Sequence, residues 1–225
     1  MKVIAVVPIK LNSVRLPQKN IRSFKNGQPL CCYILNTLLA VQNIDEVYVY
    51  CSNPKIKDYI PKEVKFLQRS PQLDLDTTKM NEVLKSFGEE VYADIYVVTH
   101  TTAPFVKKES IEKGLHAVLE QGYDSAFAVK RLQDFLWKDG RPYNYSLEDI
   151  PRTQDLEAVY EETSGFYIFE RSVMTDYNRR IGKRQYMVEV SEIEAIDIDE
   201  EEDFIIADAI FNYLRILPGG ERVTL

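Results

Sequence analysis

Two aspartates near the end of the sequence, Asp197 and Asp199, have the chemistry and the spacing of ligands to a divalent cation. They alternate with isoleucines over residues 196–199, so on a strand both carboxylates would point to the same face. Two hard oxygen ligands on one face suit Mg²⁺, which keeps several waters and takes further ligands from nucleotide phosphates. The neighbouring acids over 200–203 have a simpler explanation, because acidic residues favour the first turn of a helix. The pattern therefore predicts Asp197 and Asp199 as metal ligands.

Cationic residues gather at the opposite end of the chain. Residues 1–44 contain six Lys and Arg and no Asp or Glu, whereas residues 185–214 contain ten acids and no Lys or Arg. The whole chain has 28 Lys and Arg against 35 Asp and Glu, a net charge of −7. A cationic segment in an acidic protein is typical of a local anion site rather than of a surface that coats nucleic acid. An ordinary solvated basic loop is the alternative.

The position of these cations favours the anion site. Residues 3–9 form a short apolar run rich in β-branched residues, which predicts a buried strand. A polar loop follows, and residues 29–42 then have the apolar spacing of a helix. A strand, a polar loop and a helix in this order hold phosphates in α/β proteins, at the carboxyl end of the first strand. The loop offers six candidate side chains, which are Lys10, Asn12, Ser13, Arg15, Lys19 and Asn20.

The rest of the sequence alternates between strands and helices. Strands are predicted over 46–52, 64–68, 91–98, 124–129, 166–169 and 185–190, and helices over 79–87, 108–121, 172–181 and 201–217, with a short helix capped by Asn53. This alternation indicates an α/β fold with a mostly parallel sheet. Residues 131–161 interrupt it with aromatic residues, prolines and mixed charges. We interpret the chain as one domain over 1–225 with 131–161 as an inserted extension.

Composition excludes several classes of protein. No apolar run approaches the ~20 residues that span a bilayer, and the start of the chain lacks a secretory signal pattern. The three cysteines form neither a disulfide framework nor a zinc spacing, and two histidines exclude a multi-histidine metal site. We therefore expect a cytoplasmic protein that binds neither membrane nor nucleic acid.

The polar loop also resembles a known motif. The stretch Lys10–Asn20, K-x-x-S-x-R-L-P-x-K-N, is similar to the amino-terminal motif of the CMP-sugar-acid synthetases. These cytidylyltransferases activate nonulosonic acids of the sialic-acid type and 3-deoxy-manno-octulosonate. The segment 196–204 resembles the I-D-I-D-x-x-x-D-F/L motif of the same family, which again implies Asp197 and Asp199 as Mg²⁺ ligands.

Two further segments resemble the family in the same order. Arg69 and the pair Asp76-Thr77 match the pattern R-P-x-x-L-A-x-D-T, which implies nucleotide contacts for Arg69 and Asp76. A cap on the following helix is the structural alternative for Asp76 or Thr77. His100 and Thr102 lie where the family usually has L-Q-P-T-S-P-L-R. Because His100 replaces the Gln that touches the sugar acid there, the substrate stays open, and we expect His100 and Thr102 to line the substrate pocket.

The extension also has a counterpart in this family, where it reaches a second subunit and closes over the sugar-acid pocket. The segment 152–156 resembles the family pattern R-x-Q-x-L, which implies Arg152 and Gln154 as substrate ligands. Arg152 could hold a carboxylate as a bidentate fork, or it could form an ion pair in an interface. An exposed aromatic-rich segment fits an interface, so we expect a homodimer.

Taken together, the resemblance implies a three-layer Rossmann-like nucleotide-diphospho-sugar transferase fold with an inserted dimerisation extension. It implies a Mg²⁺-dependent reaction in which CTP and a nonulosonic acid give the CMP-sugar acid and pyrophosphate. It also implies that the phosphates are held by Lys10, Arg15 and Lys19, and that the cytosine is read by Asn20 and Arg69. An octulosonate-type enzyme is one alternative. A sugar-phosphate nucleotidyltransferase is another, although its Gly-rich loop is absent. The altered segment 100–106 leaves a catalytically idle nucleotide-binding relative as the third.

Overall fold

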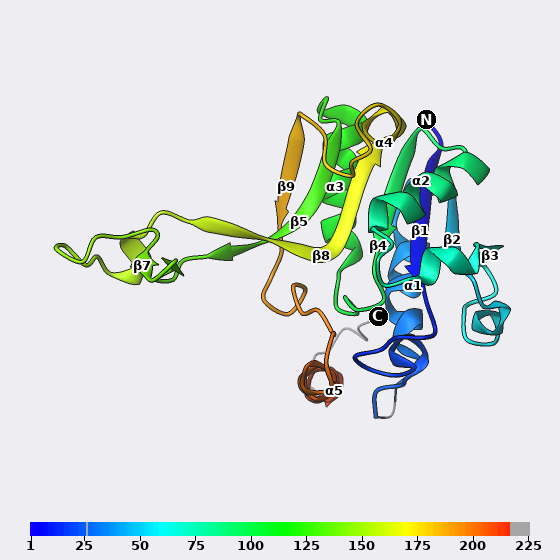
Figure 1. Cartoon of the computed structure of the whole chain (residues 1–225), viewed down its shortest axis with the longest axis horizontal. Coiled ribbons are helices and arrows are strands. Elements are labelled where there is room, and N and C mark those ends of the chain that lie inside the picture. Colours follow the sequence, from blue (N-terminus) through cyan, green and yellow to red (C-terminus); the bar gives the residue numbers. More distant parts are fainter. Residues whose placement is uncertain (26, 217–225) are drawn as a thin grey trace.

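A seven-stranded sheet forms the centre of the molecule, as the computed structural model of residues 1–25 and 27–216 shows (Figure 1). From edge to edge the strands are β3 (Lys65–Gln68), β2 (Glu46–Cys51), β1 (Val3–Ile9), β4 (Ile95–Thr99), β8 (Val159–Glu170), β5 (Ser125–Leu132) and β9 (Gln185–Glu189). β8 runs antiparallel to both of its neighbours, and the other adjacent strands are parallel. The predicted α/β fold with a mostly parallel sheet is confirmed.

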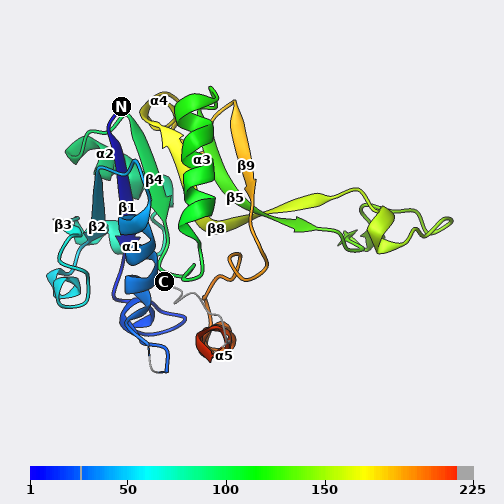
Figure 2. The same cartoon turned by 180° about the vertical axis from the view of Figure 1, so that it is seen from behind.

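Helices cover both faces of the sheet and give three layers. α1 (Leu30–Ala40) and α3 (Lys108–Glu120) pack on one face, and α2 (Met80–Glu90) and α4 (Arg171–Tyr177) on the other (Figures 1 and 2). β1 explains why both faces need covers. Val3, Ala5 and Val7 join the core under α1 and α3, whereas Ile4 and Val6 join the core under α2 and α4. A strand buried on both faces reads as a continuous apolar run.

The last helix, α5 (Glu201–Ile216), lies apart from these layers, beyond the carboxyl ends of β1 and β4 (Figure 1). Its apolar side packs on the loop that follows β1. Phe24 of that loop has its ring centroid 5.1 Å from that of Phe204 and 5.2 Å from that of Phe211. Leu217, at the predicted end of this helix, lies outside the described residues.

Several predicted boundaries are wrong. Residues 91–94 precede β4 instead of belonging to it, and the strand predicted over 166–169 is the end of the twelve-residue β8. The short helix predicted after Asn53 is confirmed as the 3₁₀-helix Pro54–Asp58, and the Asn53 side chain caps it by accepting a hydrogen bond from Lys55 N. Neither Asp76 nor Thr77 caps α2, because the cap residue is Lys79. Further 3₁₀-helices cover Lys19–Ile21, Pro71–Asp74 and Thr153–Asp155.

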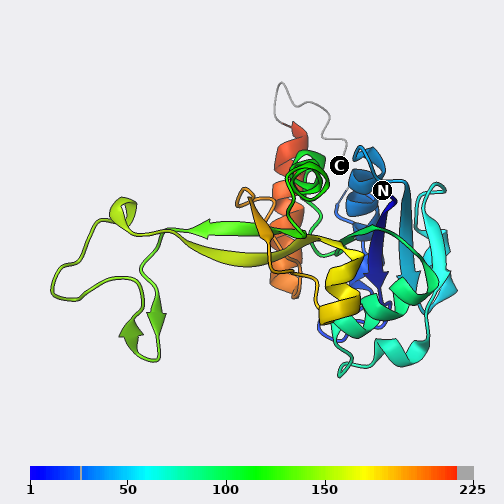
Figure 3. The same ribbon diagram turned by 90° about the horizontal axis from the view of Figure 1, so that it is seen from above.

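Residues 131–161 form an arm that projects far from the sheet (Figure 3). Its base is regular sheet, since β5 and β8 continue to pair as far as Leu132 and Val159. The arm also carries a small hairpin of β6 (Trp137–Lys138) and β7 (Arg141–Pro142). Its turn needs positive φ at Asp139 (52°) and Gly140 (74°), which Asp and Gly tolerate better than most residues. Within the described ranges, no helix combines the length and apolar character needed to cross a membrane.

Candidate active site

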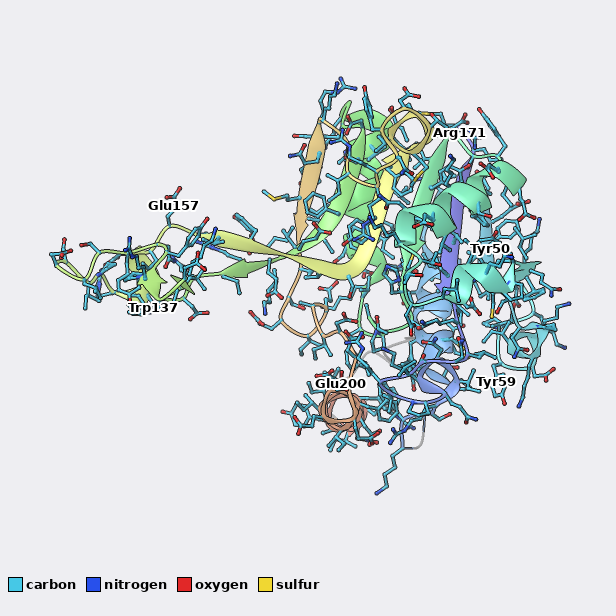
Figure 4. The ribbon with its side chains drawn as sticks, viewed as in Figure 1. Tyr50, Tyr59, Trp137, Glu157, Arg171 and Glu200 are labelled. Carbon is cyan, nitrogen blue, oxygen red and sulfur yellow. The ribbon has the colours of Figure 1, made fainter. Side chains whose placement is uncertain are left out.

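The sequence-predicted cations and acids meet at one edge of the sheet. The loop after β1, the turn after β4 and the segment before α5 come together there, and Glu200 marks the place in Figure 4. A backbone hydrogen bond from Ile198 N to Thr102 O, 2.9 Å long, joins the last two of these segments. The carboxyl edge of a parallel sheet is where α/β proteins bind ligands.

Residues 196–199 do not form the predicted strand. They are an irregular extended segment in which Ile198 is fully buried, Asp197 is exposed and Asp199 is half-buried. The alternation of apolar and acidic residues therefore separates a buried Ile198 from the more exposed aspartates without any strand pairing. Ile198 anchors the segment in a core with Leu16 and Phe204, and the two carboxylates flank that anchor.

Lys19 is the buried centre of the site. Its Nζ donates to Ile198 O at 2.7 Å and to Asp199 Oδ1 at 3.0 Å, and the residue is only 7% exposed. Arg15 contributes a second cation, with Nη1 2.8 Å from the other Asp199 oxygen and 3.6 Å from Glu200. Two cations from the first loop thus share one carboxylate from the end of the chain.

This arrangement keeps Asp199 ionised. Burial favours its neutral form, but the hydrogen bond and charge of Lys19, helped by Arg15, outweigh burial and lower the pKa of Asp199. Conversely, the charge of Asp199 raises the pKa of Arg15. Both groups therefore stay charged at neutral pH. Charged groups held in place before a reaction are what stabilisation of a polyanionic transition state requires.

Lys10 and Asp76 meet at the outer side of the same loop. Lys10 Nζ donates to Asp76 Oδ1 at 2.8 Å, and this hydrogen bond lowers the pKa of Asp76. Asn12 is exposed and Ser13 half-buried on the same loop. The residues predicted to hold the nucleotide phosphates, together with Asp76, therefore lie along one side of the site.

Asn20 ties the site together. Its Nδ2 donates to Lys10 O at 2.7 Å, and its Oδ1 accepts a hydrogen bond from the Thr101 hydroxyl. Both polar atoms of this buried side chain are bound to protein, so Asn20 links the ends of β1 and β4. Sequence reasoning missed Thr101, which the resemblance aligned with a proline.

Arg69 is buried at the end of β3 and is already paired. Its Nε and Nη2 donate to Asp74 Oδ1 at 3.0 and 2.6 Å, and the other oxygen of Asp74 accepts from Ser52 Oγ at 2.5 Å. This network shapes the loop from β3 to α2. Any contact of Arg69 with a base would add to that role.

His100 and Thr102 follow β4 and face the centre of the site. His100 is half-buried and makes no hydrogen bond through its ring within the part of the chain that is described. Burial, with the charge of Arg180, lowers its pKa to about 4, although Asp197 and Asp199 act in the opposite direction. His100 is thus neutral at neutral pH.

Arg152 and Gln154 are the two candidate residues that the fold does not bring to this edge. Both lie in the arm, away from the loop after β1 (Figures 1 and 3). Arg152 donates from Nε and Nη2 to the carboxylate of Asp155 at 2.8 and 3.0 Å. Within this chain they serve the arm rather than the site.

Two site residues went unnoticed in the sequence. Glu194 is a buried carboxylate that accepts from Lys107 N at 3.1 Å and Ser110 Oγ at 2.6 Å, fixing the acidic segment to the start of α3. Arg180 is the other, because its positive charge helps to lower the pKa of His100. Its signal was the cationic run at 179–184, directly before the acidic stretch. Glu194 left no signal, because it looks like any other acid of that stretch.

The two aspartates fit a metal that takes most of its ligands from elsewhere. In the described residues, no group of three or more His, Cys, Asp and Glu side chains could hold a metal. Asp197 and Asp199 flank Ile198, which is buried and bonded through its backbone N to Thr102 O after β4. Two carboxylates completed by water and substrate phosphates are a normal Mg²⁺ site.

A hollow between α2 and α4 is not part of this site. Its lining includes Gly88, Tyr96 and Arg171, and Figure 4 shows Arg171 at the end of the sheet opposite to Glu200. Strand order and charge therefore define the candidate site better than concavity does.

Comparisons with known proteins agree with this geometry. A family model described as cytidylyltransferase matches residues 4–216. The chain is 24% identical over 214 residues to N-acylneuraminate cytidylyltransferase A of Danio rerio, covering 91% of this chain and 49% of that protein. It is 31% identical over 126 residues to the CMP-N,N'-diacetyllegionaminic acid synthase of Legionella pneumophila, covering 52% of each. The chain thus spans about half the length of these relatives.

Solved structures share the fold. One is a CMP:2-keto-3-deoxy-manno-octonic acid synthetase complexed with CTP, with a TM-score of 0.70 at 16% identity over 95% of this chain and 99% of that one. Another is the 4-diphosphocytidyl-2C-methyl-D-erythritol synthase of Anaerococcus prevotii, with a TM-score of 0.64 at 14% identity over 94% of this chain and 96% of that one. At such identities the likeness concerns the fold.

Proposed function

The chain belongs to the cytidylyltransferase family, and from this premise we propose that it transfers CMP from CTP to a nonulosonic acid. The relatives named for N-acylneuraminate and N,N'-diacetyllegionaminic acid support an acceptor of this class. The products are the CMP-sugar acid and pyrophosphate.

One observation carries the proposal. Lys19 and Arg15, both from the loop after β1, converge on Asp199 near the other end of the sequence at 3.0 and 2.8 Å. The fold thus sets cations for a triphosphate beside carboxylates for a divalent metal. Nucleotidyl transfer needs this combination, because its catalysis rests on positioning and charge stabilisation.

The residues divide the work between the two substrates. Lys10, Arg15 and Lys19 hold the phosphates from the side of β1, and Arg69 and Asn20 shape the end that receives the cytosine. The anomeric hydroxyl oxygen of the acid bonds to the α-phosphorus, the bond from that phosphorus to the bridging oxygen breaks, and pyrophosphate leaves. The hydroxyl proton passes to solvent. His100 is a poor general base, since its pKa near 4 leaves it little affinity for a proton.

Asp197 and Asp199 would hold Mg²⁺. When bound, the ion neutralises charge on the triphosphate and on the leaving pyrophosphate. Asp199 is bound to Lys19 and Arg15 here, so its carboxylate would be shared between these cations and the metal.

We also assign the arm to a homodimer. Its exposed apolar side chains include Trp137, Leu147 and Ile150, and an apolar, aromatic surface on a projecting arm fits an interface. Arg152 and Gln154 lie on the same arm and do not reach their own site. In a dimer they could serve the site of the partner subunit. The three cysteines Cys31, Cys32 and Cys51 are buried and free, which suits the cytoplasm.

Pyrophosphate release tests the activity. The chain is incubated with Mg²⁺, each of the four nucleoside triphosphates, and N-acetylneuraminic, N,N'-diacetyllegionaminic, pseudaminic or 3-deoxy-manno-octulosonic acid. We expect release with CTP and a nonulosonic acid, and its loss with EDTA. Sugar 1-phosphates are tested separately as the acceptors that a sugar-phosphate nucleotidyltransferase would use. Release with a sugar 1-phosphate alone, or binding of CTP without any turnover, would contradict the proposal.

A further inference from the structure

Arg180, in the loop between α4 and β9, is a cation with no role in the reaction as described above. Its guanidinium carbon lies 3.9 Å from the centroid of the Tyr167 ring. Its Nη2 donates to the Tyr167 hydroxyl at 3.2 Å and lies 3.5 Å from a Glu162 oxygen. Stacking on a buried ring holds a guanidinium in one orientation. Arg180 is therefore a fixed positive group.

Tyr167 directs Arg180 to the carboxyl edge of the sheet. It pairs with Val98 of β4, two residues before His100. Its hydroxyl reaches along β8, where it donates to Glu162 Oε1 at 2.5 Å and lies 3.3 Å from Thr163 O. Because β8 runs antiparallel to β4, residue 163 lies toward the carboxyl end of β4. Arg180 consequently lies toward the end of the sheet at which His100 follows β4.

Arg180 approaches the site from the side opposite to the phosphate-binding loop. β4 stands between β1 and β8 in the sheet, so Lys10 and Lys19 come from one side and Arg180 from the other. The positive charge of Arg180 lowers the pKa of His100, whereas the charges of Asp197 and Asp199 raise it. Cations from both neighbouring strands, β1 and β8, thus flank the carboxyl end of β4.

Arg180 also has donors to spare. Only its Nη2 makes hydrogen bonds with described residues, and its side chain is 28% exposed. A planar guanidinium with free N–H groups matches a carboxylate through two parallel hydrogen bonds. Arg152, by contrast, already holds both oxygens of Asp155 in the arm.

We propose that Arg180 binds the carboxylate of the acceptor sugar acid, an inference that rests on the proposed function. In such an acid the carboxylate and the attacking hydroxyl are attached to the same carbon. Holding the carboxylate therefore orients the hydroxyl toward the α-phosphorus. The positive charge also offsets the repulsion between the substrate and the carboxylates of Asp197 and Asp199.

The test compares Arg180→Gln with Arg179→Gln. Arg179 is the matched control, because it is the adjacent cation and lies instead 5.0 Å from the Tyr177 ring. The substrates are CTP and whichever of the four sugar acids named above the wild-type protein uses fastest. For Arg180→Gln we expect kcat/KM for the acid to fall about 30-fold, as fits the loss of a charged bidentate contact, and KM for CTP to change less than about twofold. Arg179→Gln should match the wild type.

The methyl ester of the same acid separates a direct contact from a structural one. The wild type should prefer the free acid over its ester, and Arg180→Gln should lose most of that preference. Arg180→Lys keeps the charge and should fall between the two. If Arg180→Gln fails to fold, Arg180→Lys still tests the inference. Lysine cannot form the two parallel hydrogen bonds to a carboxylate, so this variant should raise KM for the acid and leave KM for CTP unchanged.

Three outcomes oppose the inference and differ from one another. Equal kinetics of the two Gln variants in an active protein overturns the role of Arg180 and leaves the proposed function standing. A rise in KM for CTP alone assigns Arg180 to the triphosphate instead. Absence of pyrophosphate release from the wild type with every acid removes the proposed function, and the inference with it.

Discussion

The ammonium group of Lys19 lies 3.0 Å from the carboxylate of Asp199, across a separation of 180 residues in sequence. The same ammonium bonds to Ile198 O at 2.7 Å. The loop after β1 and the acidic segment before α5 are therefore joined into one structure. A change in either should affect the other, and the following predictions use this coupling.

Asp199→Asn keeps the shape of the side chain and removes its charge. We expect kcat to fall about 10²–10³-fold, the scale of losing one charge-stabilising group, because a metal ligand and the partner of two cations are lost together. Pyrophosphate release at saturating CTP measures this. Glu202→Gln is the control, because Glu202 is an exposed acid in the first turn of α5, shortly after Asp199 in the sequence. An Asn variant with more than half of the wild-type rate would remove Asp199 from the site.

His100 should make the fold sensitive to mild acid. Its pKa is about 4 in the folded chain, against 6.5 for an unperturbed histidine. Between these values the unfolded chain binds a proton that the folded chain excludes, so stability is complete above about pH 6.5 and falls as the pH drops toward 4. The loss amounts to at most about 3 kcal/mol.

His100→Gln isolates this effect from the titration of carboxylates. Urea unfolding at pH 7 and pH 4.5 should show a smaller loss of stability for the variant than for the wild type. His116 is exposed and paired only with Glu120, so His116→Gln should behave like the wild type. An identical pH dependence in all three proteins would show that His100 titrates normally.

Glu194→Ala should destabilise the fold by about 2–3 kcal/mol, because Lys107 N and Ser110 Oγ lose a buried charged acceptor. The acidic segment should also loosen and raise KM for CTP. Urea unfolding and steady-state kinetics measure the two effects. Glu192→Ala is the control, because the Glu192 side chain is 78% exposed and its carboxylate comes no closer than 3.7 Å to Lys130 Nζ. Its stability should stay within about 0.5 kcal/mol of the wild type.

The arm should control assembly. Replacing Trp137 and Ile150, which are 58% and 61% exposed, by serine should convert a dimer to monomer in size-exclusion chromatography with light scattering. The unfolding midpoint of the monomer should change little, because neither side chain belongs to the core. Leu39→Ser, at an exposed position of α1, is the control and should remain dimeric. A monomeric wild type would contradict the assignment of the arm.

Much of the fold could be read from local pattern. The apolar run at 3–9 predicted both ends of β1 correctly, because a short apolar run rich in β-branched residues is typical of a buried strand. Strand ends were less certain. β8 was predicted at 166–169 and spans Val159–Glu170, because its first half lies in the arm and lacks the apolar signal of a core strand.

The candidate site was harder to predict, since its contacts join distant segments. The residue types at 10, 15, 19, 197 and 199 pointed to phosphate and metal chemistry. Nothing local showed that Asn20 has both polar atoms bound by Lys10 and Thr101. The pairing of Arg69 with Asp74 was equally hidden, although only five residues separate them. Such pairings depend on where the chain turns, which the pattern of residue types leaves open.

The aromatic cluster beneath α5 makes the candidate site depend on a segment that is synthesised late. All seven strands of the main sheet lie within residues 3–189, so the sheet can form while later residues are still being synthesised. The wall of the site cannot, because Leu16, Phe24 and Tyr33 are covered by Ile198, Phe204 and Phe211. The central sheet therefore does not need α5 for its strands to pair, whereas the wall of the candidate site does. The candidate site is complete only once the chain has been synthesised through α5.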